Sequence, residues 1–158
     1  MWNKIKPYVI SVAIALAVGG LSALLSKNGM ELYQNKLQPP LSPPMWLFPV
    51  VWSILYILMG TGAALVYTGR DKDPEAATDA LVTYGFQLAV NFFWSLIFFV
   101  LQSYLFAFIW LIVLWVLIIV MIVKFSRIST PAAWLQVPYL VWVTFAGYLT
   151  LTVYLLNG

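Results

Sequence analysis

Five long apolar runs, each close to the length that crosses a bilayer, constrain the fold of this chain most strongly. A helix needs about 20 apolar residues to span the hydrocarbon core. Only 8% of the residues are charged, against about 25% in a soluble domain. We therefore predict an all-α membrane protein, a single domain over residues 1–158 built as a five-helix transmembrane bundle. The runs cover about residues 7–26, 46–68, 80–102, 104–125 and 132–156.

The start of the chain also resembles a secretory signal peptide, because Lys4 and Lys6 precede the first apolar run. That run is 20 residues long, from Pro7 to Ser26. The apolar part of a signal peptide has only about 7–15 residues. We therefore interpret the first run as a span that stays in the protein.

Lysine and arginine residues indicate which loops lie on the same side of the membrane. Six of the eight fall at the N-terminus and in the second and fourth connections, and only Lys27 and Lys36 fall on the other side. Cytoplasmic loops carry an excess of these residues. We therefore predict a multi-pass protein of the cell membrane with a cytoplasmic N-terminus, and with the first loop and the C-terminus outside.

The residue types that are missing exclude several kinds of chemistry. The sequence has no cysteine and no histidine, and the last four spans hold no charged residue between their ends. Ion pumps and proton-coupled transporters normally need charged groups there. No nucleophile–base pair and no phosphate-binding loop is found. We expect no metal, no cofactor and no nucleic-acid partner.

The spans differ in the residues that they offer to their neighbours. Small residues recur every four positions in the first span, from Ser11 to Ala23, and again at Gly60 and Ala64. Such stripes let helix backbones approach closely, so we predict that the first span packs tightly against a neighbour. The fourth span has no such stripe and no polar residue inside it. We predict that it is the helix most exposed to lipid.

A proline-rich segment separates the first two spans, with four prolines between Pro39 and Pro44. Because proline fixes φ and lacks an N–H group, this segment cannot be helical. We predict that residues 27–45 form a loop that covers the mouth of the bundle as a stiff lid. Pro49 is compatible with a helix because it falls in the first turn of the second span.

Short segments separate the remaining spans. Thr78 or Asp79 is predicted to cap the start of the third span. The connection Gln102–Ser103 is so short that the third and fourth spans must be antiparallel neighbours. Inside the fifth span, Pro138 has no N–H group for the carbonyl of Trp134, so we expect a kink there.

Three spans each carry aromatic or amide side chains on one helical face, because residues three or four apart are neighbours there. A buried amide costs free energy unless it is hydrogen-bonded. For Gln87 and Asn91 two interpretations stay open. Each side chain either forms a hydrogen bond between helices or orients a ligand, and the second interpretation applies above all to Asn91. The residues on these three helical faces are Phe48, Trp52, Tyr56, Gln87, Asn91, Trp94, Tyr139, Trp142 and Ala146.

Trp52, Trp94 and Trp142 lie too far inside their spans to belong to the aromatic belt at the membrane surface. At about 1.5 Å per residue, all three fall in the outer half of the bundle, beneath the proline-rich segment. They form either an aromatic protein core or an aromatic-lined pocket for a flat hydrophobic ligand.

Three stretches carry a resemblance to a known family. They are PPLSPPMWLFPVVWSILYILMG, QLAVNFFWSLIFF and VPYLVWVTFAGYL. They resemble the signatures of the TspO/MBR family, which are P-x-W-x-P-P-x-W-x-F-P-x-x-W-x-x-L-Y-x-x-M-G, Q-L-x-x-N-x-x-W-x-x-x-F-F and P-Y-x-x-W-x-x-x-A-x-x-L-N. The family is also called tryptophan-rich sensory proteins and, in mitochondria, translocator proteins. The resemblance covers essentially the whole chain.

The resemblance implies a five-helix bundle, often a homodimer, with an outward cavity closed by the first loop. It also implies binding of porphyrins, isoquinoline and benzodiazepine drugs and, in animals, cholesterol. Leu41 and Thr150 depart from the signatures, and the C-terminal tail lacks the basic residue of the proposed cholesterol motif. Carried over by position, the ligand site includes Tyr33, Pro43, Phe48, Trp52, Asn91, Trp94, Trp142 and Ala146.

Three functions follow as expectations. The first is a binding protein for porphyrin-type tetrapyrroles and similar planar ligands that acts as a sensor or regulator of a tetrapyrrole or stress response. The second is an enzyme that degrades protoporphyrin in light and oxygen, with Trp52 and Trp142 as the candidate catalytic residues. The third is a transporter of tetrapyrroles or other lipophilic molecules.

Overall fold

The computed structural model describes residues 1–34 and 42–157, and this part of the chain is helical without a strand. Five helical segments are long and apolar enough to cross a membrane, which confirms the predicted fold class. The π-helical turn η2 continues α3, and the short α5 precedes α6 in the last span. The elements are α1 (Trp2–Gln34), α2 (Leu47–Thr68), η1 (Arg70–Lys72), α3 (Pro74–Ser95), η2 (Leu96–Val100), α4 (Tyr104–Ser126), α5 (Thr130–Trp134) and α6 (Val137–Asn157).

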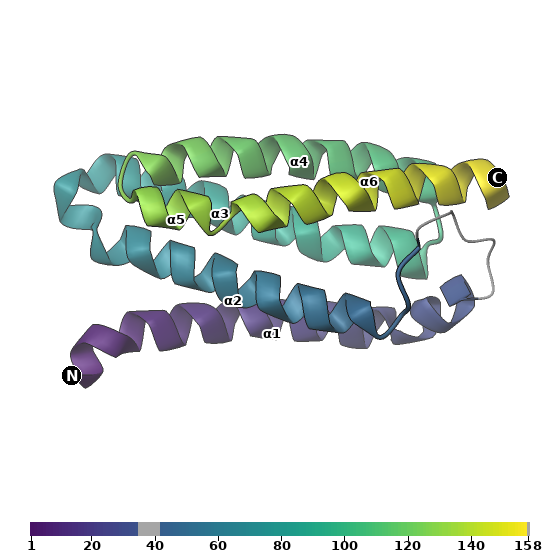
Figure 1. Ribbon diagram of the computed structural model, residues 1–158, viewed down its shortest axis with the longest axis horizontal. Coiled ribbons are helices and arrows are strands. Elements are labelled where there is room, and N and C mark those ends of the chain that lie inside the picture. The colour runs from purple at the N-terminus through teal and green to yellow at the C-terminus, as the bar shows by residue number, and fades with distance from the viewer. Residues whose placement is uncertain (35–41, 158) are drawn as a thin grey trace.

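The helices run along a common long axis, and the two termini lie at opposite ends of the bundle (Figure 1). α1 lies beside α2 along one side, and α4 packs between α3 and α6 on the other. This arrangement explains why the prediction for the fourth span was wrong. In their most apolar stretches, 28% of the α4 residues are buried but only 17% of the α1 residues, because α1 lies at the edge of the bundle.

The stripe of small residues on α1 packs closely against α2, as predicted. A Cβ atom built on Gly60 would lie 2.6 Å from the Cα atom of Val12, so only glycine allows this approach. The hydroxyl of Ser11 donates to the carbonyl of Gly60 over 2.7 Å. Further along, the ring of Tyr56 occupies the space beside Gly19.

The first helix continues beyond its predicted end. α1 extends through residues 27–34, so the predicted lid loop 27–45 is wrong over this part. A Cβ on Gly29 would collide with the carbonyl oxygen of Phe99, so packing against η2 supports the added turns. Residues 42–44 are not helical, and Pro49 falls in the first turn of α2. Residues 35–41, with Pro39 and Pro40, lie outside the described residues.

The third helix begins at Pro74, earlier than predicted. Its N-cap is Asp73, whose carboxylate accepts from the backbone N–H of Ala76 over 3.1 Å, so the caps predicted at Thr78 and Asp79 were wrong. Pro74 fits the first helical position, where no N–H is needed. Asp79 instead pairs with Lys124 of α4, with an oxygen–nitrogen distance of 3.0 Å.

The short connection after the third span and the kink in the last span are both present, as the sequence predicts. Residues 101–103 connect η2 to α4, and Gln102 adopts a left-handed φ of 53°, which reverses the chain so that α3 and α4 are neighbours. The last span breaks between Trp134 and Val137, one residue before Pro138. At the break the buried Gln136 donates its amide to the carbonyl of Leu58 over 3.3 Å, which ties the last span to α2.

Candidate ligand-binding cavity

A cavity lies among α1, α2, α6 and the end of α3 with η2, in the half of the bundle away from the N-terminus. Its volume, measured as the space open to the centres of water-sized molecules, is about 140 Å³. Small-molecule sites have volumes of roughly 300–1,000 Å³. The cavity is smaller than this range, so a drug-sized or larger ligand would have to extend beyond it.

Aromatic side chains of α2 and α6 form one wall of the cavity. The rings of Phe48 and Trp142 meet edge-on with centroids 5.9 Å apart. Trp52 contacts Tyr56 on its own helix at 5.7 Å and Tyr139 of α6 at 6.2 Å. Because aromatic pairs prefer such tilted and edge-on arrangements, these rings hold one another in place.

The opposite wall is built by the π-helical turn η2. The wider turn buries three consecutive side chains, Ile97, Phe98 and Phe99, which a regular α-helix face does not do. Phe98 stacks on Trp94 with centroids 5.1 Å apart and lies 5.2 Å from the ring of Tyr33. Phe98 and Phe99 were missed as site residues, although they are the two phenylalanines that end the second family signature.

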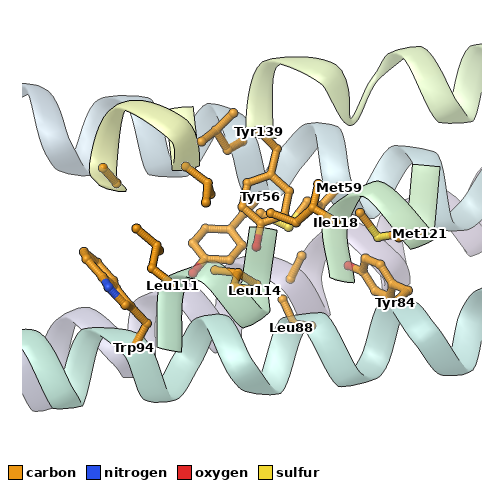
Figure 2. Packing of buried hydrophobic residues seen from close by; sticks show 14 of the residues in the cluster. Tyr56, Met59, Tyr84, Leu88, Trp94, Leu111, Leu114, Ile118, Met121 and Tyr139 are labelled. Atoms are coloured by element: carbon orange, nitrogen blue, oxygen red, sulfur yellow. The ribbon is translucent and has the colours of Figure 1, made fainter. Parts of the chain in front are cut away.

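A buried hydrogen-bond network ties α3 to α6 behind the aromatic wall of the cavity, where Tyr139 contacts Trp52. The amide nitrogen of Asn91 donates to the hydroxyl of Tyr139 over 2.9 Å, and this hydroxyl donates to the carbonyl oxygen of Gln87 over 2.7 Å. Figure 2 shows Tyr139 and Tyr56 in the middle of the core and Trp94 toward one end. Hydrogen bonding between helices accounts for both amides. Neither Gln87 nor Asn91 is among the residues that line the cavity.

The cavity brings together seven of the ten residues predicted as ligand-binding. Of the other three, Pro43 is half-buried and, like Gln87 and Asn91, is not part of the described lining. By contrast, three tryptophans point outward, since Trp2, Trp46 and Trp134 are 58%, 67% and 68% exposed. The seven lining residues are Tyr33, Phe48, Trp52, Tyr56, Trp94, Trp142 and Ala146.

The polar groups of the cavity are few. The indole nitrogens of Trp94 and Trp142 are buried without a hydrogen-bond partner among the described residues. Thr150 uses its hydroxyl within α6, where it donates to the carbonyl of Ala146 over 2.7 Å. No charged side chain lines the described part of the cavity. The arrangement can therefore enclose an apolar ring and gives it few polar contacts.

The fold and the cavity define a multi-pass membrane protein that suits a hydrophobic small-molecule ligand and a lipid environment. The sequence matches the profile of the TspO/MBR family over residues 11–155. The chain belongs to the TspO/MBR family.

Relatives from distant organisms are similar over almost their whole length. A tryptophan-rich protein TspO from Chlorobaculum tepidum is 39% identical over 158 residues, which cover 99% of both chains. Protein CrtK from Rhodobacter capsulatus is 37% identical over 91% of this chain and 89% of its own. The human translocator protein is 29% identical over 97% of this chain and 89% of its own.

Proposed function

We propose that this protein binds porphyrin-type tetrapyrroles and similar planar hydrophobic molecules, and that it acts as a membrane sensor or regulator of a tetrapyrrole or stress response. The observation that carries the proposal is the aromatic cavity, in which Trp52, Trp94 and Trp142 from three helices line one hollow. Flat rings gain free energy from apolar burial and from stacking on aromatic side chains. Membership of the TspO/MBR family supports the same ligand class.

A titration tests this proposal. Protoporphyrin is added to the purified protein in detergent, and tryptophan fluorescence is followed together with porphyrin absorbance. We expect saturable binding that weakens at least tenfold in Trp52→Ala and in Trp142→Ala, because each substitution removes a large part of the wall. Trp134→Ala is the matched control, since its indole is 68% exposed on the outside of the bundle. Unchanged affinity in both cavity variants would contradict the proposal.

A light-dependent breakdown of bound protoporphyrin is the second candidate function. Trp52 and Trp142 line the cavity, so an excited porphyrin there would lie beside oxidisable indoles. Illumination in air should then yield a new absorbing product that free porphyrin does not form. Bleaching at the same rate with and without protein would remove this candidate.

We further propose the cell membrane as the location, with the N-terminus in the cytoplasm, and a homodimer as the assembly. The distribution of lysine and arginine supports the orientation, and the family resemblance supports the dimer. Protease protection of tags at each terminus tests the orientation. Mass measurement of the protein in detergent, with the bound detergent subtracted, tests the assembly.

A further inference from the structure

We propose that the π-helical turn η2 (Leu96–Val100) is a register switch that sets the size of the cavity. In the π register, which the structure shows, the ring of Phe99 forms part of the cavity wall. In a regular α register Phe99 leaves the wall, Leu101 turns inward in its place, and the cavity widens. The role of the ligand in this inference rests on the proposed function, whereas the switch itself is tested without a ligand.

The sequence pattern of α3 continues in the α register through the turn. Residues three or four apart recur on the buried face of the helix, which is typical of one α-helical face. Because an α-helix turns about 100° per residue, Leu101 would lie within about 20° of Trp94, and Phe99 about 140° away. The residues of this series are Gln87, Asn91, Trp94, Phe98 and Leu101.

The structure has the opposite arrangement of the last two side chains. Phe99 is 7% exposed and lines the cavity, whereas Leu101 is 65% exposed. The π turn causes this exchange, because the N–H group of Leu101 donates to the carbonyl of Leu96, five residues back, over 3.0 Å. Transfer of this hydrogen bond to the carbonyl of Ile97 would restore the α register. Each register turns an apolar side chain inward, so the sequence is compatible with both.

The change can be confined to residues 96–103, because the chain before them is held in place. Asn91 is hydrogen-bonded to α6, and the indole of Trp110 in α4 donates to the carbonyl of Val90 over 2.7 Å. Gln102, in the connection to α4, has a left-handed φ of 53°, which is unfavourable for a residue other than glycine. Short π-helical turns inside α-helices frequently mark functional sites. The connection can therefore take up the rotation of the turn.

Gly29 of α1 stabilises the π register. A Cβ atom at this position would collide with the carbonyl oxygen of Phe99, so only glycine allows η2 to approach α1 in this way. In the α register this carbonyl turns away from α1 together with its residue. A methyl group at position 29 therefore disfavours the π register selectively.

The size of the cavity explains why a ligand would shift the switch. Its volume of about 140 Å³ is below the roughly 300–1,000 Å³ of small-molecule sites. A ligand shifts an equilibrium only if it binds one state more tightly than the other. A tetrapyrrole that needs the space of the Phe99 ring binds the α register more tightly, and it therefore favours the wider cavity.

Single cysteines test the switch without a ligand, since the chain has no cysteine of its own. The rate of reaction with N-ethylmaleimide is measured on the full chain in detergent. Gly29→Ala should slow the labelling of Leu101→Cys at least fivefold, because this position turns inward. Val100→Cys is the control, since Val100 is 50% exposed and stays about 120° from Trp94 in an α-helix. Its rate should not change.

Two further substitutions keep this test decisive. Gly20→Ala is the matched control for Gly29→Ala, because a Cβ at position 20 meets nothing within 4 Å, and it should leave both rates unchanged. If Gly29→Ala does not fold, Gln102→Val takes its place, because a β-branched residue disfavours a left-handed φ. An unchanged labelling rate of Leu101→Cys, or an equal loss in Val100→Cys, would overturn the switch.

Protoporphyrin then tests the role of the ligand. A saturating concentration should slow the labelling of Leu101→Cys at least fivefold and leave Val100→Cys unchanged. If protoporphyrin binds without this effect, the ligand does not use the switch, although the proposed function holds. If protoporphyrin does not bind, the proposed function fails, and the labelling of Leu101→Cys in the Gly29→Ala background still decides whether the switch exists.

Discussion

Asn91 of α3 and Tyr139 of α6 are joined by a 2.9 Å hydrogen bond, and each side chain is at least 98% buried. The same tyrosine hydroxyl donates to Gln87 over 2.7 Å, so one oxygen satisfies two amides one helical turn apart. A buried polar group without a partner is costly in the hydrocarbon core. This network therefore fixes how α6 faces α3 near the residues that line the cavity.

Tyr139→Phe should destabilise the protein. The substitution keeps the ring but leaves the two amides without their shared partner, which costs about 1–3 kcal/mol in the free energy of unfolding. Denaturation in mixed detergent micelles measures this loss. Tyr67→Phe is the control, because Tyr67 is 45% exposed and lies outside the network. Equal stability of the two variants would mean that the network contributes little.

Gly60→Ala should separate α1 from α2. The added methyl group would lie 2.6 Å from the Cα atom of Val12, and backbone atoms cannot yield as a flexible side chain does. Overpacking of this kind costs about 1–3 kcal/mol in stability. Gly85→Ala is the matched control, since a Cβ atom at that position meets no other atom within 4 Å. That control should gain up to about 1 kcal/mol from better helix propensity.

Ala146→Phe should fill part of the cavity. Ala146 lines the hollow and is 6% exposed, so a phenyl ring there occupies space that a ligand would use. We expect protoporphyrin to bind at least tenfold more weakly, measured by fluorescence titration. Ala89→Phe places the same ring on an exposed part of α3 and should bind like the unmodified protein. Full affinity in Ala146→Phe would place the ligand elsewhere.

Asp73→Ala should weaken the start of α3. Loss of the carboxylate that accepts from the N–H group of Ala76 costs about 1 kcal/mol of unfolding free energy. Asp73→Asn keeps a good capping side chain and should cost only a few tenths. A comparison of the two variants in the same unfolding assay separates the loss of the cap from the loss of charge. Equal losses would argue against the cap.

Local chemistry explains which parts of the fold could be predicted. Apolar runs of bilayer length gave the five spans, and Pro138 gave the break in the last span, because both effects act within one helix. The extension of α1 to Gln34 could not be predicted in this way. It depends on the fit of Gly29 against the backbone of Phe99, a contact between residues far apart in the sequence.

The same division applies to the site. Spacing placed Trp52, Trp142 and Trp94 at similar depth, and they do line one cavity. The spacing of residues along the helices alone does not determine whether Asn91 faces that cavity or another helix. The position of Tyr139 decides this, because its hydroxyl lies within hydrogen-bond reach of both amides.

The sequence by itself determined that this chain crosses a membrane with five helices and carries aromatic rings on their inward faces, since length, apolarity and helical spacing are properties of single segments. Only the tertiary structure decided which donors remain free. A hydrogen bond needs two groups at one distance, and the π-helical turn and the packing of α6 against α3 set those distances. They engage Asn91, and among the described residues they leave the N–H group of Trp94, which lines the cavity, without a hydrogen-bond partner.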